Sequence, residues 1–113
     1  LCIIQSMSLY DQRLIQLVKL LREFHPRKIY AFGSLTRSKG SRDSDIDIAA
    51  VLDSEVDTIE LKRKFALRLW ETHYPFDLEP DIHMIPVNIF TERLRSGDPF
   101  ITNVAGGKLI YES

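Results

Sequence analysis

A chain of 113 residues, 44% of them hydrophobic, is enough for one globular domain, and its net charge of −1 argues against a large surface for nucleic-acid phosphates. No apolar run approaches the roughly 20 residues of a membrane span, and the opening apolar patch lacks the basic start and cleavage site of a signal peptide. The single cysteine, Cys2, cannot form an internal disulfide, which is typical of a reducing, cytoplasmic setting. Residues 1–6 precede Met7, and we interpret them either as native chain or as a leader or added segment.

The first half of the chain alternates helical and strand signals. Apolar residues at three- and four-residue spacing predict a helix over residues 8–24, which ends because Pro26 biases His25 away from helical geometry. Residues 28–32 predict a strand that Gly33 stops, and residues 45–52 predict a second one after a polar turn region. Asp57 and Glu60 have the spacing of a capping box, so we expect a helix from there to about residue 72.

The second half continues this mixed pattern. Residues 73–80 predict a loop and residues 81–85 a third strand, followed by a short helix over 88–96. Asp98 and Pro99 form a cap and first turn for another helix, which Gly106 and Gly107 end before an extended segment at 108–113. We therefore expect a single α+β domain over residues 1–113, with a small mixed β-sheet flanked by helices that lie on one side of it.

Three aspartates, Asp43, Asp45 and Asp47, fall at alternate positions where the chain turns hydrophobic. Alternate side chains of a strand share a face, so Asp45 and Asp47 point away from the isoleucines between and after them. Two carboxylates about 7 Å apart along a strand repel each other unless a cation lies between them. Because Mg²⁺ takes oxygen ligands and often uses one or two carboxylates plus substrate phosphates, this pair predicts a metal site.

A calcium-binding loop is excluded, although the alternating aspartates imitate its start. Ile48 stands where such a loop needs glycine, and Ser54 stands where it needs a bidentate glutamate. We therefore interpret Asp43 as a loop residue.

The turn before the aspartates has the residues of a phosphate cradle. Gly33 has no Cβ and lets backbone approach a ligand closely, and Ser34 offers a hydroxyl and an amide at a helix start. Arg37 is a candidate for a charge-assisted contact to the same phosphates, with a solvated loop charge as the equal alternative. A phosphate cradle beside a metal-binding carboxylate pair is what nucleotidyl transfer requires.

Gly33 and Ser34, ten further residues, and then Asp45-x-Asp47 resemble the signature of the minimal nucleotidyltransferase family, within the DNA polymerase β-like superfamily. The order of elements is similar to that family across nearly the whole chain. The resemblance implies a palm-like sheet, a two-metal Mg²⁺ site on Asp45 and Asp47, ATP as nucleotide donor, and phosphate contacts from Gly33 and Ser34. It also implies a third carboxylate, by position Asp81, that helps bind metal and accepts the proton of the attacking hydroxyl.

The chain departs from the family pattern at two points. Ser38 replaces a glycine that often follows Arg37, so the path of that loop is open. Asp77 and Glu79 lie near Asp81, and we prefer Asp81 because it directly precedes an apolar run.

Other noteworthy side chains have plainer interpretations. We expect His83 to be a partly buried strand histidine, and we expect Trp70, Tyr74 and Phe76 to pack the second long helix and its exit, with a base-stacking platform as the alternative. Residues 61–64 predict a solvated helix face, and Lys39 and Arg42 surface charge, although both could steer a nucleotide.

Three functions remain open at this point. Minimal nucleotidyltransferases often occur with a small helical HEPN protein, an RNase toxin whose tyrosine receives AMP, and the resemblance implies this antitoxin role. The alternatives are a catalytically silent module that neutralises a partner by contact, and transfer to a small molecule, whose binding site a homo-oligomer would have to build.

Overall fold

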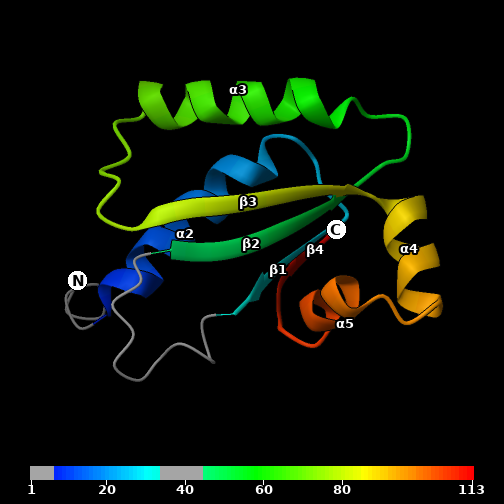
Figure 1. The fold of residues 1–113 in the computed structure, drawn as a ribbon. Helices are drawn as coiled ribbons and strands as arrows, with labels where there is room; N and C mark the ends of the chain where they lie inside the picture. The colour runs from blue at the N-terminus through cyan, green and yellow to red at the C-terminus, as the bar shows by residue number, and fades with distance from the viewer. Residues whose placement is uncertain (1–6, 34–44) are drawn as a thin grey trace.

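The computed structural model describes residues 7–33 and 45–113 (Figure 1). The predictions made for Ser34, Arg37 and Asp43 lie outside the described residues. In chain order the elements are α2 (Leu9–Arg22), β1 (Lys28–Phe32), β2 (Asp45–Leu52), α3 (Thr58–Glu71), β3 (Glu79–Pro86), α4 (Val87–Arg95), α5 (Pro99–Ala105) and β4 (Lys108–Glu112).

The helices begin where the sequence places side-chain caps. The hydroxyl of Ser8 accepts from the amide of Asp11 at 3.0 Å, the carboxylate of Asp57 accepts from two amides at the start of α3, and Asp98 caps α5. Each cap satisfies amides that have no partner inside the helix. The sequence-predicted helix starts are therefore confirmed. His25 has φ +56°, which ends the helical geometry as expected from the proline after it.

The strands form one four-stranded mixed sheet in the order β3-β2-β1-β4. β1 pairs antiparallel with both β2 and β4, whereas β2 and β3 run parallel. The parallel pair needs the crossover connection that α3 supplies. This α+β sheet confirms the predicted fold class.

β3 starts at Glu79, two residues earlier than the sequence predicted, so the end of the expected 73–80 loop was wrong. Glu79 pairs with Asp45 and Pro80 pairs with Ile46. A proline is tolerated there because β3 is an edge strand, where a missing amide donor leaves no ladder bond unmade.

Helices cover both faces of the sheet, so the expectation of helices on one side was wrong (Figure 1). On one face α2 and α3 pack Leu17, Leu21 and Phe65 against strand residues such as Ile46 and Ile48. On the other face α4 and α5 bring apolar side chains of their own onto the alternate strand positions, namely Phe90, Ile101 and Val104 against Tyr30, Phe32, Ala49, Val51 and Ile85.

α4 and α5 are short, and the sequence gives no signal for the face that they cover. Burying an apolar side chain stabilises the fold by about 1.5–3 kcal/mol, so both layers contribute to holding the sheet. No helix within residues 7–33 and 45–113 is long and apolar enough to cross a membrane.

The exit of α3 only partly matches the expectation. Tyr74 is buried, and its hydroxyl donates to the carbonyl of Leu78 at 2.6 Å. Phe76 contacts Tyr74 edge to face but is half exposed. Trp70, which we expected to pack at this exit, is exposed on the outer face of α3.

Candidate active site

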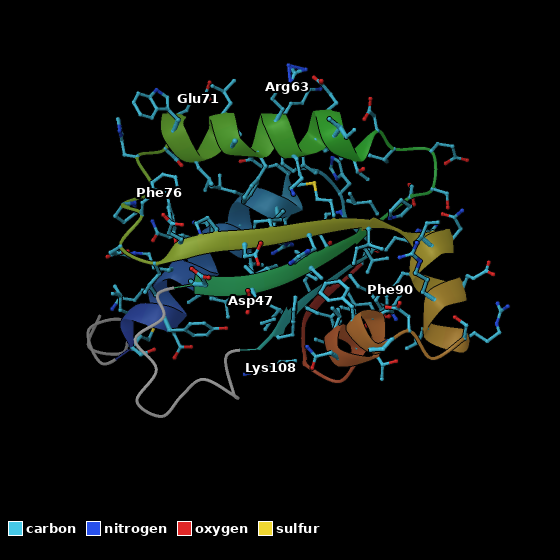
Figure 2. All side chains as sticks on the ribbon, in the orientation of Figure 1. Asp47, Arg63, Glu71, Phe76, Phe90 and Lys108 are labelled. Carbon is cyan, nitrogen blue, oxygen red and sulfur yellow. The ribbon has the colours of Figure 1, made fainter. Side chains whose placement is uncertain are left out.

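The candidate site lies at the end of the sheet where β1 finishes and β2 and β3 begin. Asp47 is the register partner of Phe32 on one side and of Asp81 on the other. Neighbouring strands lie about 4.8 Å apart, and register partners point to the same face of a sheet. The sheet therefore places Asp47 next to Asp81, although the two are far apart in sequence. Figure 2 shows where Asp47 lies on β2.

A second carboxylate pair lies two residues earlier on both β2 and β3, where these strands begin. Asp45 is the register partner of Glu79, and by strand alternation both share a face with Asp47 and Asp81. Along each strand these positions repeat at about 7 Å. The four carboxylates occupy the corners of a small rectangle on the sheet face opposite the buried Ile46 and Ile48. We call this set the carboxylate rectangle: Asp45, Asp47, Glu79 and Asp81.

Ile46 and Ile48 explain why this local sequence folds as it does. Both side chains are 0% exposed in the core beneath α2 and α3, so the strand cannot rotate or slip by one residue without exposing them. The same constraint fixes Asp45 and Asp47 on the opposite face. The alternation predicted from the sequence is confirmed.

His83 is next to the carboxylates on the same face of β3. Its Nε2 lies 3.4 Å from Oδ2 of Asp81, with His83 34% and Asp81 55% exposed. The imidazole is also packed against aromatic rings, 5.7 Å from Phe32 and 5.0 Å from Phe100 between ring centroids. The expected half-buried strand histidine is therefore present, and it contacts one of the candidate carboxylates.

Asp77, which was a competing third carboxylate, belongs to a different cluster. Its two oxygens accept from Arg13 of α2, from Nε at 2.7 Å and from Nη2 at 2.8 Å. These bonds hold the pKa of the Asp77 carboxyl below its usual range. Asp77 therefore braces the α3–β3 loop against α2 instead of joining the carboxylate rectangle.

Glycines shape the adjoining end of the sheet. Gly33 follows β1 with φ +80°, a backbone conformation that L side chains rarely adopt. Gly107 precedes β4 and lies against β1 so closely that an added Cβ would come within 2.5 Å of the Ala31 carbonyl oxygen. Lys108 is the register partner of Ala31, which brings a cation to the same end of the sheet.

The side chains of the rectangle fit a hard divalent cation, because all of them offer carboxylate oxygens. Among the described residues, no three His, Cys, Asp or Glu side chains converge on one ion position. An ion at this site would therefore take one or two protein carboxylates and complete its shell with water or substrate phosphates, which is the usual arrangement for Mg²⁺. The candidates for holding it are Asp45, Asp47 and Asp81.

An open hollow of about 370 Å³ lies along the outer edge of β3, beyond His83. Its walls are partly apolar, from Ile89 and Phe100, and partly cationic, from Lys62 and Arg93. The hollow lies on the side of the carboxylates away from β1 and Gly33. A ligand in it would approach the rectangle from the flank opposite β1 and Gly33.

Two features of this site were not recognised from the sequence. The strand parity of His83 was noted, but nothing signalled its contact with Asp81 or its packing on Phe100, which is far along the chain. Glu79 was set aside as a loop residue, whereas it faces Asp45. The pairing of Glu79 with Asp45 becomes apparent only from the register of the parallel strands β2 and β3.

Comparison with known proteins agrees with this geometry. Residues 14–105 match the family model described as a nucleotidyltransferase domain. No curated protein and no solved structure matches the chain. The match spans every described element from the interior of α2 to α5, including the strands that carry the carboxylates. The chain therefore belongs to the nucleotidyltransferase domain family, and its mixed sheet is the polymerase β-like fold of that family.

Proposed function

We propose that this protein transfers AMP from ATP to an acceptor hydroxyl, in a Mg²⁺-dependent reaction that releases pyrophosphate. The observation that carries the proposal is the pairing of Asp47 with Asp81, in the register row of Phe32, the last residue of β1 before Gly33. It brings carboxylates next to a turn whose glycine adopts a left-handed backbone. Family membership supports nucleotidyl transfer in general.

In the proposed reaction the acceptor oxygen bonds to the α-phosphorus of ATP, and the bond from that phosphorus to the bridging oxygen of pyrophosphate breaks. Asp45, Asp47 and Asp81 would hold the divalent ions, which supply charge neutralisation for the phosphates. Asp81 would also accept the hydroxyl proton. Gly33 and Ser34 would bind phosphate oxygens through backbone amides, with Arg37 adding a cation.

The proposed acceptor is a tyrosine of a small helical HEPN-type protein, which would make this protein the antitoxin of a pair. The hollow beside His83 supports an acceptor that approaches along β3, because it opens next to Asp81 and has both apolar and cationic walls. A protein acceptor also agrees with the exposure of Asp45, Glu79 and Asp81 at this end of the sheet.

The test uses ATP labelled on the α-phosphate, the purified protein, Mg²⁺ and the small helical protein encoded by the adjacent gene, which the proposal requires to be of HEPN type. We expect α-label on the partner, no transfer of γ-label, and loss of transfer with a chelator or in Asp45→Asn. Asp77→Asn is the matched control, because it removes a carboxylate that is bound to Arg13 outside the rectangle. Transfer in Asp45→Asn equal to that of the wild type would contradict the proposal.

Two further outcomes separate the alternatives. Label on an added aminoglycoside but not on protein would retain the transferase and replace the acceptor. Absence of Mg²⁺-dependent ATP binding by calorimetry, combined with inhibition of the partner by contact, would identify a silent binding module.

A further inference from the structure

The outer face of α3 carries an apolar surface that nothing in the described structure covers. Ile59 is 80% exposed, Leu67 55% and Trp70 77%. At 100° per residue these positions fall within one quadrant of the helix, opposite Phe65 and Leu69, which are buried against the sheet. We call Ile59, Leu67 and Trp70 the α3 stripe.

The stripe lies on the outside of the molecule. In Figure 1 α3 forms the outermost layer over the sheet, and in Figure 2 Arg63, which follows Ile59 by one turn, extends away from the strands. Three large exposed apolar side chains in line on one helix are the pattern by which an amphipathic helix binds a partner helix. A tryptophan at such a place is typical of the residues that dominate protein interfaces.

Arg63 lies within the stripe, between Ile59 and Leu67, and one lysine lies on each side of it. The acidic residues on its flank, Glu60 and Glu71, are both paired with arginines of α3. Lys62, Arg63 and Lys64 lie in the middle of α3. Arg63 pairs with Glu60, whereas no ion pair among the described residues includes Lys62 or Lys64. A partner that covers the stripe therefore gains from carboxylates placed beside its own apolar residues.

The same charges disfavour a second copy of this chain as the occupant. In an antiparallel pair of α3 helices with Ile59 of each copy opposite Trp70 of the other, residue 64 would lie opposite residue 65 and residue 63 opposite residue 66. Arg63 and Lys64 of both copies would therefore lie near the two-fold axis. A parallel pair would align identical charges along its whole length. Either arrangement would collect cations at the centre of the contact, where like charges are destabilising.

We propose that the α3 stripe binds an acidic amphipathic helix of a partner protein. This docking surface lies across the sheet from the carboxylate rectangle and does not depend on the transferase reaction. Asp45→Asn is accordingly expected to leave binding unchanged. A failed transfer assay and a failed docking assay would thus be distinguishable.

The test follows fluorescence, because Trp70 is the single tryptophan of the chain. The probes are two stapled helical peptides with the same leucine stripe, one flanked by glutamates and the other by lysines. We expect a saturable blue shift with the acidic peptide, weakened by added salt, and no shift with the basic one. Lys62→Glu/Lys64→Glu is expected to weaken binding at least tenfold, and Leu67→Gln to weaken it similarly.

Matched controls change charge or apolar area elsewhere. Arg95→Glu/Lys108→Glu makes the same charge change at exposed positions outside the hollow that Lys62 lines, and Leu94→Gln alters an exposed leucine of α4; both are expected to bind like the wild type. No shift with the acidic peptide, or equal shifts with both peptides, would overturn the proposal. So would a blue shift with phosphatidylserine vesicles alone, or a dimer in sedimentation that Leu67→Gln abolishes, since these identify a lipid surface or a second copy as the occupant.

Discussion

Arg13 and Asp77 form a two-bonded ion pair between α2 and the loop that enters β3, with N–O distances of 2.7 and 2.8 Å. The loop is thereby held to the helix two residues before β3 begins at Glu79. β3 then pairs in register with β2, which brings Glu79 opposite Asp45 and Asp81 opposite Asp47. One carboxylate of this acidic segment thus braces the strand, and the next two face the candidate site.

The structural role of Asp77 and the proposed active-site roles of Glu79 and Asp81 can be separated by comparing three substitutions in the transfer assay. Asp81→Asn is expected to lower kcat by about 100-fold or more, because a general base contributes roughly 10²–10⁴ and a metal-binding oxygen would be lost as well. Asp77→Asn is expected to keep kcat and to lower the melting temperature. Glu79→Gln, which removes one charge from the rectangle, is expected to act mainly through the KM for ATP. A large loss of kcat in Asp77→Asn with a normal Asp81→Asn would reverse the assignment.

Acid should weaken the fold through the exposed ion pairs. Hydrogen bonds from Arg13 lower the pKa of Asp77, and those from Arg68 lower the pKa of Glu23. A carboxyl with a lowered pKa in the fold stabilises it above the pKa of the unfolded chain, and this contribution is lost as the pH falls through the folded value. The ordinary values are 3.8 and 4.5, so the loss is expected below about pH 4.5.

Denaturant midpoints measured from pH 7 downward check this expectation. The fall should be shallower in Asp77→Asn/Glu23→Gln, and shallower in high salt, because exposed pairs are screened. The matched control is Glu92→Gln, which alters an exposed carboxylate that forms no ion pair among the described residues. A profile that is the same in the double variant and the wild type would contradict the role of the two pairs.

Ionisation of Tyr74 is expected to limit the stability of the fold at alkaline pH. Burial raises the pKa of its phenol to about 12 from an ordinary 10.0, and the neutral hydroxyl donates to Leu78. A raised pKa in the fold gives stability that is complete below pH 10 and is lost as the pH rises toward 12. We expect the free energy of unfolding to fall across this window and to fall less in Tyr74→Phe.

The alkaline titration can be followed directly by phenolate absorbance. A late step near pH 12 should be present in the wild type and should vanish in Tyr74→Phe. Tyr111→Phe, which alters a partly exposed tyrosine, is the control and should leave the late step in place. Absence of the late step from the wild type would contradict the burial argument.

Local signals explain how much of this molecule could be predicted from its sequence. Alternation in residues 45–48 predicts which face carries the aspartates, and the cap residues Asp57 and Asp98 predict the starts of two helices. Each of these depends on neighbours within a few residues. The spacing of Gly33 from Asp45 was sufficient to identify the family that the comparison confirms.

Long-range relationships could not be obtained in this way. The pairing of Asp47 with Asp81 depends on strand register, and the layer of α4 and α5 depends on which sheet face remains open after α2 and α3 have packed. The amphipathic pattern predicted α3 but not that Trp70 would face solvent. The apolar residues of α3 belong to two different faces of the helix. The exposed face can be recognised only after the structure shows that Phe65 and Leu69 form the buried one.

Gly107 offers a test of the close approach between β4 and β1. A Cβ at this position would lie 2.5 Å from the Ala31 carbonyl oxygen and 2.9 Å from Cβ of Phe32, and neither atom can move without shifting β1. Gly107→Ala is therefore expected to destabilise the protein by about 1–3 kcal/mol, the range for overpacked sites. Because Phe32 precedes Gly33 and pairs with Asp47, the same change should also lower transfer activity.

Gly106 is the matched control, one residue earlier. Its φ is −81°, and an added Cβ would meet its nearest atom, the Thr102 carbonyl oxygen, at 3.4 Å, which an alanine can accept. Gly106→Ala is expected to be neutral or to stabilise by about 0.4–1 kcal/mol, since alanine restricts the unfolded chain. Urea unfolding of both variants measures the difference. Equal effects from the two substitutions would show that the contact between Gly107 and β1 does not constrain this end of the sheet.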